Sequence, residues 1–194
     1  MKKKIGLYFG TFNPIHVGHM IIANHMVEHS ELDEVWLVVT PHNPLKKKST
    51  LLKDYHRYRM VELALEDYPK LKASKIEFDL PQPNYTVNTL IHLNEHYPEY
   101  KFNLIMGQDN LQSFKKWKNY EVILANYSIY VYPRLYKNRK KSELINHNKI
   151  HLVTAPIIEL SSTFIRKGIK NNYNIKPLLT SKVWQYLDEM NFYK

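Results

Sequence analysis

Short apolar runs and segments with helical spacing take turns along most of the chain. The apolar runs predict strands at residues 5–9, 35–40, 76–79, 102–106, 127–132 and 150–154. The helical spacing predicts helices around residues 20–26, over residues 55–67 and 86–96, toward Lys115 after a turn at residues 107–110, and from Ser162 and Thr180 onward. Strands that alternate with helices are typical of an α/β fold built on a parallel sheet.

Three polar loops begin where predicted strands end. Gly10 follows the first strand, His42 comes soon after the second, and Gly107 follows a later one. Ligands of parallel α/β sheets bind at the carboxyl ends of the strands, near the point where the strand order reverses. We therefore expect these loops to converge on one edge of the sheet.

The segment from residue 10 to residue 19 reads Gly-Thr-Phe-Asn-Pro-Ile-His-Val-Gly-His and lies between a strand and a helix. A glycine turn that leads into a helix is a common phosphate site, because free backbone N–H groups point at the anion. The segment is neither a Walker A loop nor a dinucleotide-binding GxGxxG turn. Its histidines, His16 and His19, can donate hydrogen bonds to a phosphate under attack and can carry charge near neutral pH.

A second segment, residues 160–168, reads Leu-Ser-Ser-Thr-Phe-Ile-Arg-Lys-Gly. Ser161 or Ser162 can cap a helix whose first N–H groups face an anion, and Arg166 lies one turn along that helix. An arginine in that place can hold a leaving pyrophosphate through two parallel hydrogen bonds. A Ser-Ser-Thr run alone is a common helix cap without further function, so its interpretation depends on the first segment.

The composition limits the class of protein. With 194 residues and no linker, repeat or low-complexity tract, residues 1–194 are expected to form one domain with a helical portion from about residue 160. The absence of cysteine excludes thiol catalysis, cysteine zinc sites and disulfides. No apolar stretch approaches the roughly 20 residues of a membrane span, and the run at residues 5–9 is too short for a signal peptide. We expect a cytoplasmic protein without a membrane partner.

Basic residues outnumber acidic ones by 28 to 18, which gives a formal net charge of +10. Much of the excess is scattered over residues 2–4, 46–48, 115–118 and 134–141. A lysine-rich surface with a pocket for an anionic nucleotide fits this scatter better than a nucleic-acid interface does, so no nucleic-acid partner is expected. A basic nucleotide- or RNA-binding module that has lost catalysis is the alternative from another class. Its signature would be the loss of His16, His19 or Arg166, and all three are present. A homo-oligomer stays open, since enzymes of this size are often symmetric.

Together the two segments resemble the (T/H)xGH nucleotidyltransferase superfamily, and the pair is similar to its nicotinate-nucleotide adenylyltransferase branch in particular. Further stretches are similar to segments of that branch: residues 84–90 to its Y-T-x-x-T-L, residues 104–111 to its G-x-D-N-L, Trp117-Lys118 to its W-K/R, and Arg59-Met60 to an Arg-Met pair. The resemblance runs from about residue 5 to residue 170. It implies a Rossmann-like doubly wound nucleotidyltransferase fold with helices on both faces of the sheet.

The resemblance also implies roles by position. His16, His19 and Arg166 would be catalytic and would stabilise charge on the phosphates of ATP. The other ATP-binding residues would be Gly10, Thr11, Phe12, Gly18, Gly107, Asp109, Ser161, Ser162 and Thr163. Mg²⁺ would accompany ATP and be held mainly by the phosphates, because the sequence offers no carboxylate cage that would make a protein metal site.

For the second substrate, nicotinate mononucleotide, the resemblance implies contacts from Asn13, His42, Lys46, Tyr85, Thr86, Trp117, Lys118 and Arg134. Thr86 would offer backbone groups to the nicotinate carboxylate, and the indole of Trp117 would stack on the pyridine ring. Arg134 would bind the mononucleotide phosphate, although its surroundings read Tyr-Pro-Arg instead of the branch's Arg-Pro-Gly. The loop at residues 41–46 departs from the branch's P-P-H-K, so its phosphate contact can come from the histidine or the lysine.

The implied reaction transfers the adenylyl group of ATP to nicotinate mononucleotide and gives deamido-NAD and pyrophosphate, a step of NAD biosynthesis. Nicotinamide mononucleotide and a phosphopantetheine-type acceptor are the alternatives. Tyr85, Thr86 and Trp117 argue against phosphopantetheine, because that acceptor has no aromatic ring to stack. The choice between the acid and the amide stays open on the sequence.

Overall fold

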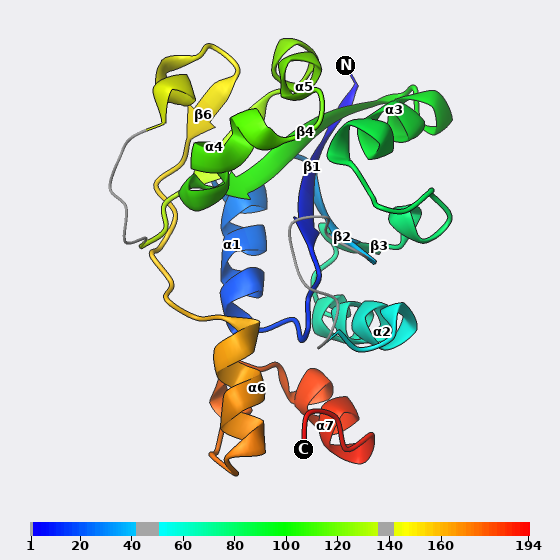
Figure 1. Ribbon diagram of the computed structural model, residues 1–194, viewed down its shortest axis with the longest axis vertical. Helices are drawn as coiled ribbons and strands as arrows, with labels where there is room; N and C mark the ends of the chain where they lie inside the picture. The colour runs from blue at the N-terminus through cyan, green and yellow to red at the C-terminus, as the bar shows by residue number, and fades with distance from the viewer. Residues whose placement is uncertain (1, 42–50, 136–141) are drawn as a thin grey trace.

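The structure of the chain, a computed structural model, describes residues 2–41, 51–135 and 142–194. In these residues six strands form one sheet, and every neighbouring pair is parallel. The strands are β1 (Lys3–Gly10), β2 (Glu34–Val39), β3 (Leu71–Ser74), β4 (Tyr100–Gly107), β5 (Ile129–Tyr132) and β6 (Ile150–Leu152). Their spatial order, β3-β2-β1-β4-β5-β6, reverses between β1 and β4 (Figure 1). This Rossmann-like doubly wound order confirms the predicted fold class.

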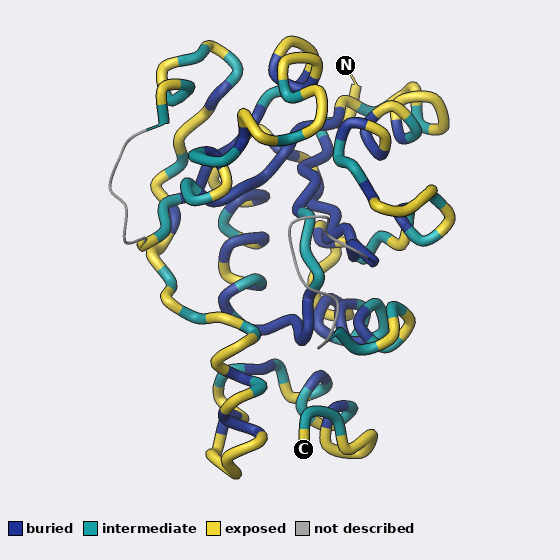
Figure 2. The backbone as a smooth tube through the Cα atoms, viewed as in Figure 1, coloured by how far each residue is buried: buried dark blue, intermediate teal, exposed yellow. Residues whose placement is uncertain are grey.

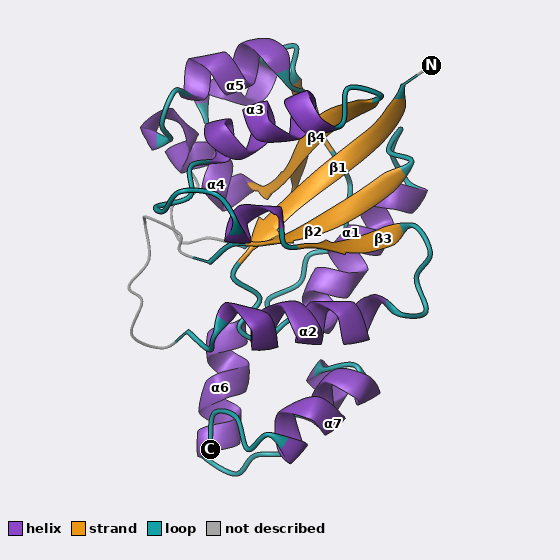
Figure 3. Cartoon of the chain, turned by 90° about the vertical axis from the view of Figure 1, so that its right-hand side faces the viewer, coloured by secondary structure: helices purple, strands orange, loops and turns teal. Residues whose placement is uncertain are grey.

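Helices cover both faces of the sheet, as predicted. In the described residues they are α1 (Val17–Glu28), α2 (Asp54–Leu65), α3 (Thr86–His96), α4 (Gln108–Ser113), α5 (Tyr120–Asn126), α6 (Ser162–Lys170) and α7 (Ser181–Glu189). Helices α3 and α5 lie over one face of the sheet, and α1 and α2 lie over the other (Figure 3). Helices α6 and α7 lie on the α2 side, away from the strands (Figures 1 and 3). None of the described helices has both the length and the apolar character needed to cross a membrane.

The strands divide the apolar core into two parts. Leu7 and Leu104 pack into the core beneath α3 and α5, while their chain neighbours Tyr8 and Ile105 pack into the core beneath α1 and α2. Successive side chains of a strand point to opposite faces, so a strand covered on both faces must be apolar at nearly every position. Strand β2 meets this demand, since all of its residues are buried (Figure 2).

The structure corrects the prediction at one edge of the sheet. The edge strand is β3, and residues Ile76–Phe78 form a 3₁₀ turn instead of the predicted strand. The apolar alternation around Glu77 is misleading, because Glu77 itself is only 1% exposed. Its Oε1 accepts a hydrogen bond of 2.7 Å from the Thr89 hydroxyl, which turns the carboxyl group inward. The apolar pattern also fails to predict the short helix α5.

Candidate active site

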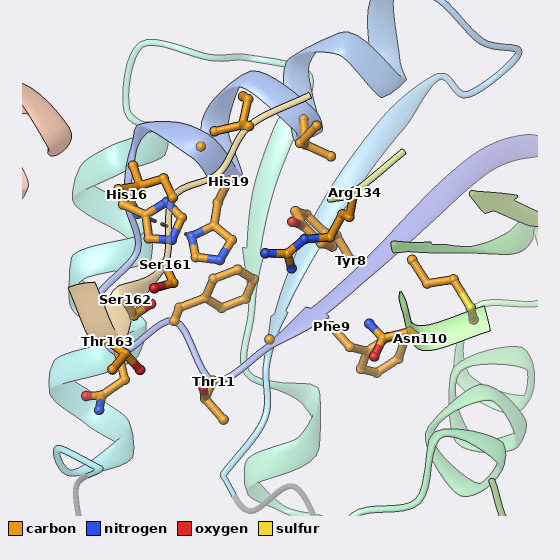
Figure 4. Close-up of a pocket in the computed structure, with 18 of the residues that line it drawn as sticks. Tyr8, Phe9, Thr11, His16, His19, Asn110, Arg134, Ser161, Ser162 and Thr163 are labelled. Carbon is orange, nitrogen blue, oxygen red and sulfur yellow. Dashed lines mark hydrogen bonds between the residues drawn. The ribbon is translucent and has the colours of Figure 1, made fainter. Parts of the chain in front are cut away.

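A cavity of about 340 Å³ opens at the carboxyl ends of β1 and β4, where the strand order reverses. Its wall brings together the two segments singled out in the sequence. His16 and His19 lie at the start of α1, and Ser161 and Ser162 lie at the start of α6 (Figure 4). Arg134 reaches in from the residues that follow β5 (Figure 4). Segments far apart in the chain thus form one polar site.

The turn between β1 and α1 is shaped by Phe12. This residue has a positive φ of 43°, a left-handed conformation that is uncommon for a bulky side chain. Its ring packs edge-on against His19 and Tyr8, with ring centroids 5.0 and 6.0 Å apart. A Cβ at Gly10 would lie 2.8 Å from the Phe12 ring, so a larger residue there would displace the ring. The glycine and the phenylalanine together hold His19 in the cavity wall.

His16 and His19 form a stacked pair with ring centroids 3.7 Å apart. The backbone N–H of His16 donates a hydrogen bond of 3.3 Å to Nδ1 of His19 (Figure 4). An Nδ1 that accepts a hydrogen bond leaves the proton of the neutral ring on Nε2. Neutral His19 therefore has the tautomer whose Nε2–H can donate to a phosphate oxygen.

His16 is 4% exposed, and its Nδ1 has no hydrogen-bond partner among the described residues. Burial, followed by the positive charge of Arg134, lowers the pKa of His16 to about 4. The sequence suggests a histidine that can carry charge near neutral pH, but this one is uncharged there. In the neutral state, its ring can offer an anion a hydrogen bond but no positive charge.

The lowered pKa of His16 makes the free energy of unfolding depend on pH. Because the folded state disfavours the charged ring, this stabilisation is fully present above the usual pKa of 6.5 and is lost as the pH falls toward 4. Between pH 7 and pH 5 the wild type should lose about 2 kcal/mol more free energy of unfolding than His16→Asn, which cannot titrate. Urea unfolding of both proteins at the two pH values measures the difference. An equal loss in both proteins would contradict a buried, neutral His16.

Helix α6 is capped and docked against the first segment. The Ser161 hydroxyl accepts a hydrogen bond of 3.2 Å from the backbone N–H of Phe164, which confirms the predicted cap. The Ser162 hydroxyl donates a hydrogen bond of 2.8 Å to the carbonyl of Pro14. The helix start is thus fixed to the turn that carries the histidines.

Arg166 binds the same turn from one helical turn further along. Its Nη1 donates to the carbonyl of Asn13 at 2.8 Å, and its Nη2 donates to the hydroxyl of Thr163 at 3.2 Å. A guanidinium has five N–H donors in a fixed fork. The N–H groups that take no part in these two bonds can bind a phosphate chain in the first cavity, which Arg166 lines.

A second cavity, of about 370 Å³, lies at the start of α3. Tyr85, Thr86, Trp117 and Lys118 line it, as the resemblance implies for an acceptor site. Tyr85 occupies the N-cap position and makes no side-chain cap hydrogen bond, so N–H groups of the first helical turn are left for a ligand. Lys118 Nζ lies 4.4 Å from the centre of the Tyr85 ring, and Lys116 also lines the cavity. The positive potential at this end suits a carboxylate.

The two cavities meet along the end of β1. Phe9, Gly10, Thr11 and Asn110 line both of them. The first cavity offers imidazole, guanidinium and hydroxyl donors, and the second offers flat aromatic rings, lysines and a helix N-terminus. This arrangement suits two anionic substrates that react where the cavities join.

For four residues, the position in the structure differs from what the substrate implied by the resemblance would suggest. Asn13 and Arg134, predicted for the acceptor, line the first cavity together with the histidines. Gly107 and Asp109, predicted for ATP, are not among the residues that line either cavity. They lie behind Arg134, whose Nη1 is 3.8 Å from Asp109 Oδ2. A Cβ at Gly107 would lie 2.7 Å from Arg134 Cδ, so this glycine makes room for the arginine.

The remaining predicted ATP-binding residues gather in the first cavity. They are Gly10, Thr11, Phe12, Gly18, Ser161, Ser162 and Thr163. Gly18 is close-packed, because a Cβ there would lie 3.1 Å from His16 Nδ1. The two residues of the loop after β2, His42 and Lys46, lie outside the described residues.

Sequence reasoning missed Arg57, whose side chain is fully buried beneath the first segment. Its Nη1 donates to the carbonyl of Thr11 at 2.6 Å and to that of Thr40 at 2.9 Å. Its other N–H groups bind the carbonyls of Leu52 and Pro41 and the carboxylate of Asp54. Arg57 thereby ties the residues that follow β1 and β2 to helix α2.

The Arg-Met pair noted in the sequence is Arg59 and Met60, and its arginine is not the buried arginine of α2. Arg59 is partly exposed and lies 3.4 Å from Glu62 on the surface of α2. Arg57 and Met60 are both completely buried and are one helical turn apart. The sequence carries no signal for Arg57, because its burial and its carbonyl partners exist only in the folded chain.

Comparisons with known proteins show the family of the chain. A sequence model of the cytidylyltransferase-like family matches residues 7–168. The chain is 69% identical to a probable nicotinate-nucleotide adenylyltransferase of Flavobacterium psychrophilum, over 98% of this chain and 99% of the relative. It is 66% identical to a protein of the same description from Christiangramia forsetii, over 100% of both chains.

Among solved structures, the chain is similar to Plasmodium falciparum nicotinic acid mononucleotide adenylyltransferase complexed with NaAD. The TM-score is 0.83 at 21% sequence identity, with 98% of this chain and 97% of that chain covered. At that identity the likeness shows the shared fold. The bacterial relatives are far more similar in sequence and extend over nearly the whole chain. The chain therefore belongs to the cytidylyltransferase-like family and, within it, to the nicotinate-nucleotide adenylyltransferases.

Proposed function

We propose that the first cavity binds ATP, that the second binds nicotinate mononucleotide, and that the protein joins them to form deamido-NAD. The observation that carries this proposal is the junction of the two cavities at Gly10, Thr11 and Asn110. One side of the junction has donors for a chain of phosphates. The other side has aromatic rings and a helix N-terminus for a flat aromatic acid. Both reacting phosphates can therefore reach the same place.

In the proposed reaction, a phosphate oxygen of the mononucleotide attacks the α-phosphorus of ATP. The new phosphorus–oxygen bond forms as the bond from the α-phosphorus to the bridging oxygen breaks. Pyrophosphate leaves with that oxygen and its electron pair. The acceptor brings its own nucleophile, so the protein needs to supply only positioning and stabilisation of charge.

The residues of the first cavity divide that task. His19 donates through Nε2–H, and neutral His16 donates an N–H, to the oxygens of the phosphate under attack. Arg166, fixed by the carbonyl of Asn13, binds the leaving pyrophosphate. Arg134 adds positive charge from the residues after β5, where either substrate's phosphate can meet it.

The residues of the second cavity select the acceptor. The nicotinate carboxylate binds at the start of α3, where Thr86 presents its backbone N–H and the N-cap side chain makes no hydrogen bond. The pyridine ring stacks on the indole of Trp117. Lys116 and Lys118 raise the potential around the carboxylate, which favours an acid over an amide.

ATP is proposed to bind together with Mg²⁺, which neutralises phosphate charge when it is bound. Among the described residues that line the first cavity there is no aspartate or glutamate, and the second cavity has Glu77 as its one carboxylate. Phosphate oxygens and water are therefore the ligands that suit the ion, in place of a carboxylate cage.

A pyrophosphate-release assay tests the proposed function. The protein is incubated with ATP and Mg²⁺ and with nicotinate mononucleotide, nicotinamide mononucleotide or phosphopantetheine as acceptor. Release is expected with a pyridine mononucleotide, and no release is expected with phosphopantetheine or without an acceptor. Release that requires phosphopantetheine would overturn the assignment of the second cavity.

Replacing Trp117 with alanine should raise KM for nicotinate mononucleotide by roughly tenfold or more, because aromatic stacking on a base contributes about 1–3 kcal/mol. KM for ATP should change little, since Trp117 lines only the second cavity among the two described. Trp117→Phe keeps a ring and should show a smaller rise. Steady-state kinetics with each substrate varied in turn measures both constants. Equal rises for ATP and acceptor would contradict the stacking role.

A further inference from the structure

The end of the chain reaches back to the turn that carries the histidines. Tyr193 follows helix α7 and is partly buried, and its hydroxyl donates a hydrogen bond of 2.6 Å to Oδ1 of Asn13. Burial raises the pKa of Tyr193, so the phenol keeps its proton and remains a donor across the physiological range. The two residues are separated by 180 positions in the chain.

Asn13 is a meeting point for three separate segments. Its side chain is 2% exposed and accepts hydrogen bonds from Tyr193 and from the backbone N–H of Leu52, which lies 3.3 Å away. Its carbonyl accepts from Arg166 at 2.8 Å. The turn between β1 and α1 is therefore held from the start of α2, from α6 and from the segment after α7. Of these, the last has no other role in the site described above.

The segment after α7 is bent in a way that chain preferences disfavour. Tyr193 has a φ of 67° and Asn191 a φ of 52°, both in the left-handed region. For a bulky residue such as tyrosine this conformation costs roughly 1–2 kcal/mol, so surrounding contacts must hold it. Phe192 supplies one such contact, because its ring lies 4.8 Å from that of His56 on α2. The bend places the Tyr193 hydroxyl on Asn13.

We propose that Tyr193 is a positioning residue for the reaction: its hydroxyl fixes Asn13, and through Asn13 it holds the His16–His19 turn and Arg166 in the arrangement that binds the phosphates of ATP. This inference rests on the proposed function. Tyr193 itself contacts no substrate and is not among the residues that line either cavity. It acts on the ATP side of the site, where Asn13 lies, and leaves the acceptor side alone.

The test compares two tyrosine-to-phenylalanine variants. Tyr193→Phe keeps the ring and removes the hydroxyl that binds Asn13. Tyr186→Phe removes a similar hydroxyl from α7. That hydroxyl lies 2.9 Å from Nδ1 of His56 on α2. Tyr193→Phe should lower kcat/KM for ATP about five- to tenfold, the effect of losing one hydrogen bond, with KM for nicotinate mononucleotide within about twofold. For Tyr186→Phe, kcat/KM for ATP and KM for nicotinate mononucleotide should both stay within about twofold of the wild-type values.

A double-mutant cycle separates positioning from general stability. In an Asn13→Ala background, Tyr193→Phe should have less than about a twofold further effect, because the two residues act as one unit. If Tyr193→Phe lowers kcat/KM as much in that background as in the wild type, the tyrosine does not act through Asn13. Equal kinetics for Tyr193→Phe and Tyr186→Phe would also overturn the inference.

Hydrogen exchange gives a readout that does not depend on the reaction. Amides of residues 10–19 should exchange faster in Tyr193→Phe than in the wild type, and Tyr186→Phe should leave them unchanged. Unchanged exchange in both variants would overturn the inference. A wild type that releases no pyrophosphate with any acceptor would overturn the proposed function, and the exchange result would still decide the role of Tyr193.

Discussion

His19→Ala is expected to lower kcat for pyrophosphate release by a factor of roughly 100 to 1000, the effect of removing one preorganised donor from a developing oxyanion. KM for nicotinate mononucleotide should change by less than about threefold, because the lost interaction belongs to the transition state. The structure supplies the reason. The His16 N–H fixes the tautomer of His19, and Phe12 fixes its ring.

His25→Ala is the matched control for this variant. His25 lies on the same helix, α1, where its ring stacks on that of His29 at 4.5 Å, outside both cavities described above. The kcat of His25→Ala should remain within about twofold of the wild-type value, as expected for a substitution away from the reacting atoms. Steady-state kinetics under saturating ATP and acceptor compares the two variants. A wild-type kcat in His19→Ala, or similar losses in both variants, would contradict the role of His19.

Arg57→Ala is expected to lower the free energy of unfolding by about 3–5 kcal/mol, which is the usual effect of removing one partner from a buried charged network. The guanidinium satisfies the carbonyls of Thr11 and Thr40 in a place that the described structure closes to solvent. Without the guanidinium, the carbonyls of Thr11 and Thr40 stay buried and lack their hydrogen-bond donor. The residues after β1 and β2 also lose their link to α2. The same loss should lower kcat, because Thr11 lines both cavities.

Arg59→Ala serves as the control on the same helix. Arg59 pairs with Glu62 at the surface, and such pairs contribute about 0–1 kcal/mol. Urea unfolding of the two variants should therefore differ by several times that amount. Where Arg57→Ala does not fold, Arg57→Lys serves in its place, because it keeps the charge but lacks the planar set of five N–H donors. Its free energy of unfolding should lie between those of the wild type and Arg57→Ala. Equal stability for Arg57→Ala and Arg59→Ala would contradict the central place of Arg57.

The parts of the fold that follow from local patterning were predictable. Strands β1, β2 and β4 are buried on both faces, so they appear in the sequence as short apolar runs. Helix α3 coincides with its predicted bounds, and α6 begins at the predicted Ser162. Strand β3 gives little signal, because Leu71–Ser74 is a short edge strand with a lysine in it. Residues 76–79 resemble a short strand in the sequence, whereas the structure has a 3₁₀ turn there with Glu77 as a buried acceptor.

The residues that line the first cavity were predictable where one segment contains both the motif and the polar side chains. His16, His19 and the start of α6 stand in motifs whose spacing is fixed locally. Arg57 and Tyr193 were not predictable in this way, since a charged or phenolic side chain on a polar helix or tail usually faces solvent. Their roles arise from carbonyl and amide groups that only the folded chain brings near. The lowered pKa of His16 likewise comes from burial, which spacing does not reveal.

The residues that line the second cavity also affect which acceptor should bind better. The start of α3 offers uncapped N–H groups, and Lys118 lies over the neighbouring Tyr85 ring. Charge-assisted hydrogen bonds are roughly twice as strong as neutral ones, so a carboxylate should gain more here than an amide. Under the proposed function, acceptor specificity resides in the second cavity, while the histidine turn and α6 bind the ATP that both reactions share.

An equimolar competition between nicotinate and nicotinamide mononucleotides tests the proposed assignment of the two cavities. The protein receives both acceptors with limiting ATP and Mg²⁺, and mass spectrometry measures deamido-NAD and NAD in the same sample. We predict that deamido-NAD exceeds NAD by about tenfold or more, a difference of about 1.4 kcal/mol in transition-state binding. An excess of NAD, or neither product, would contradict the assignment of the two cavities to ATP and nicotinate mononucleotide.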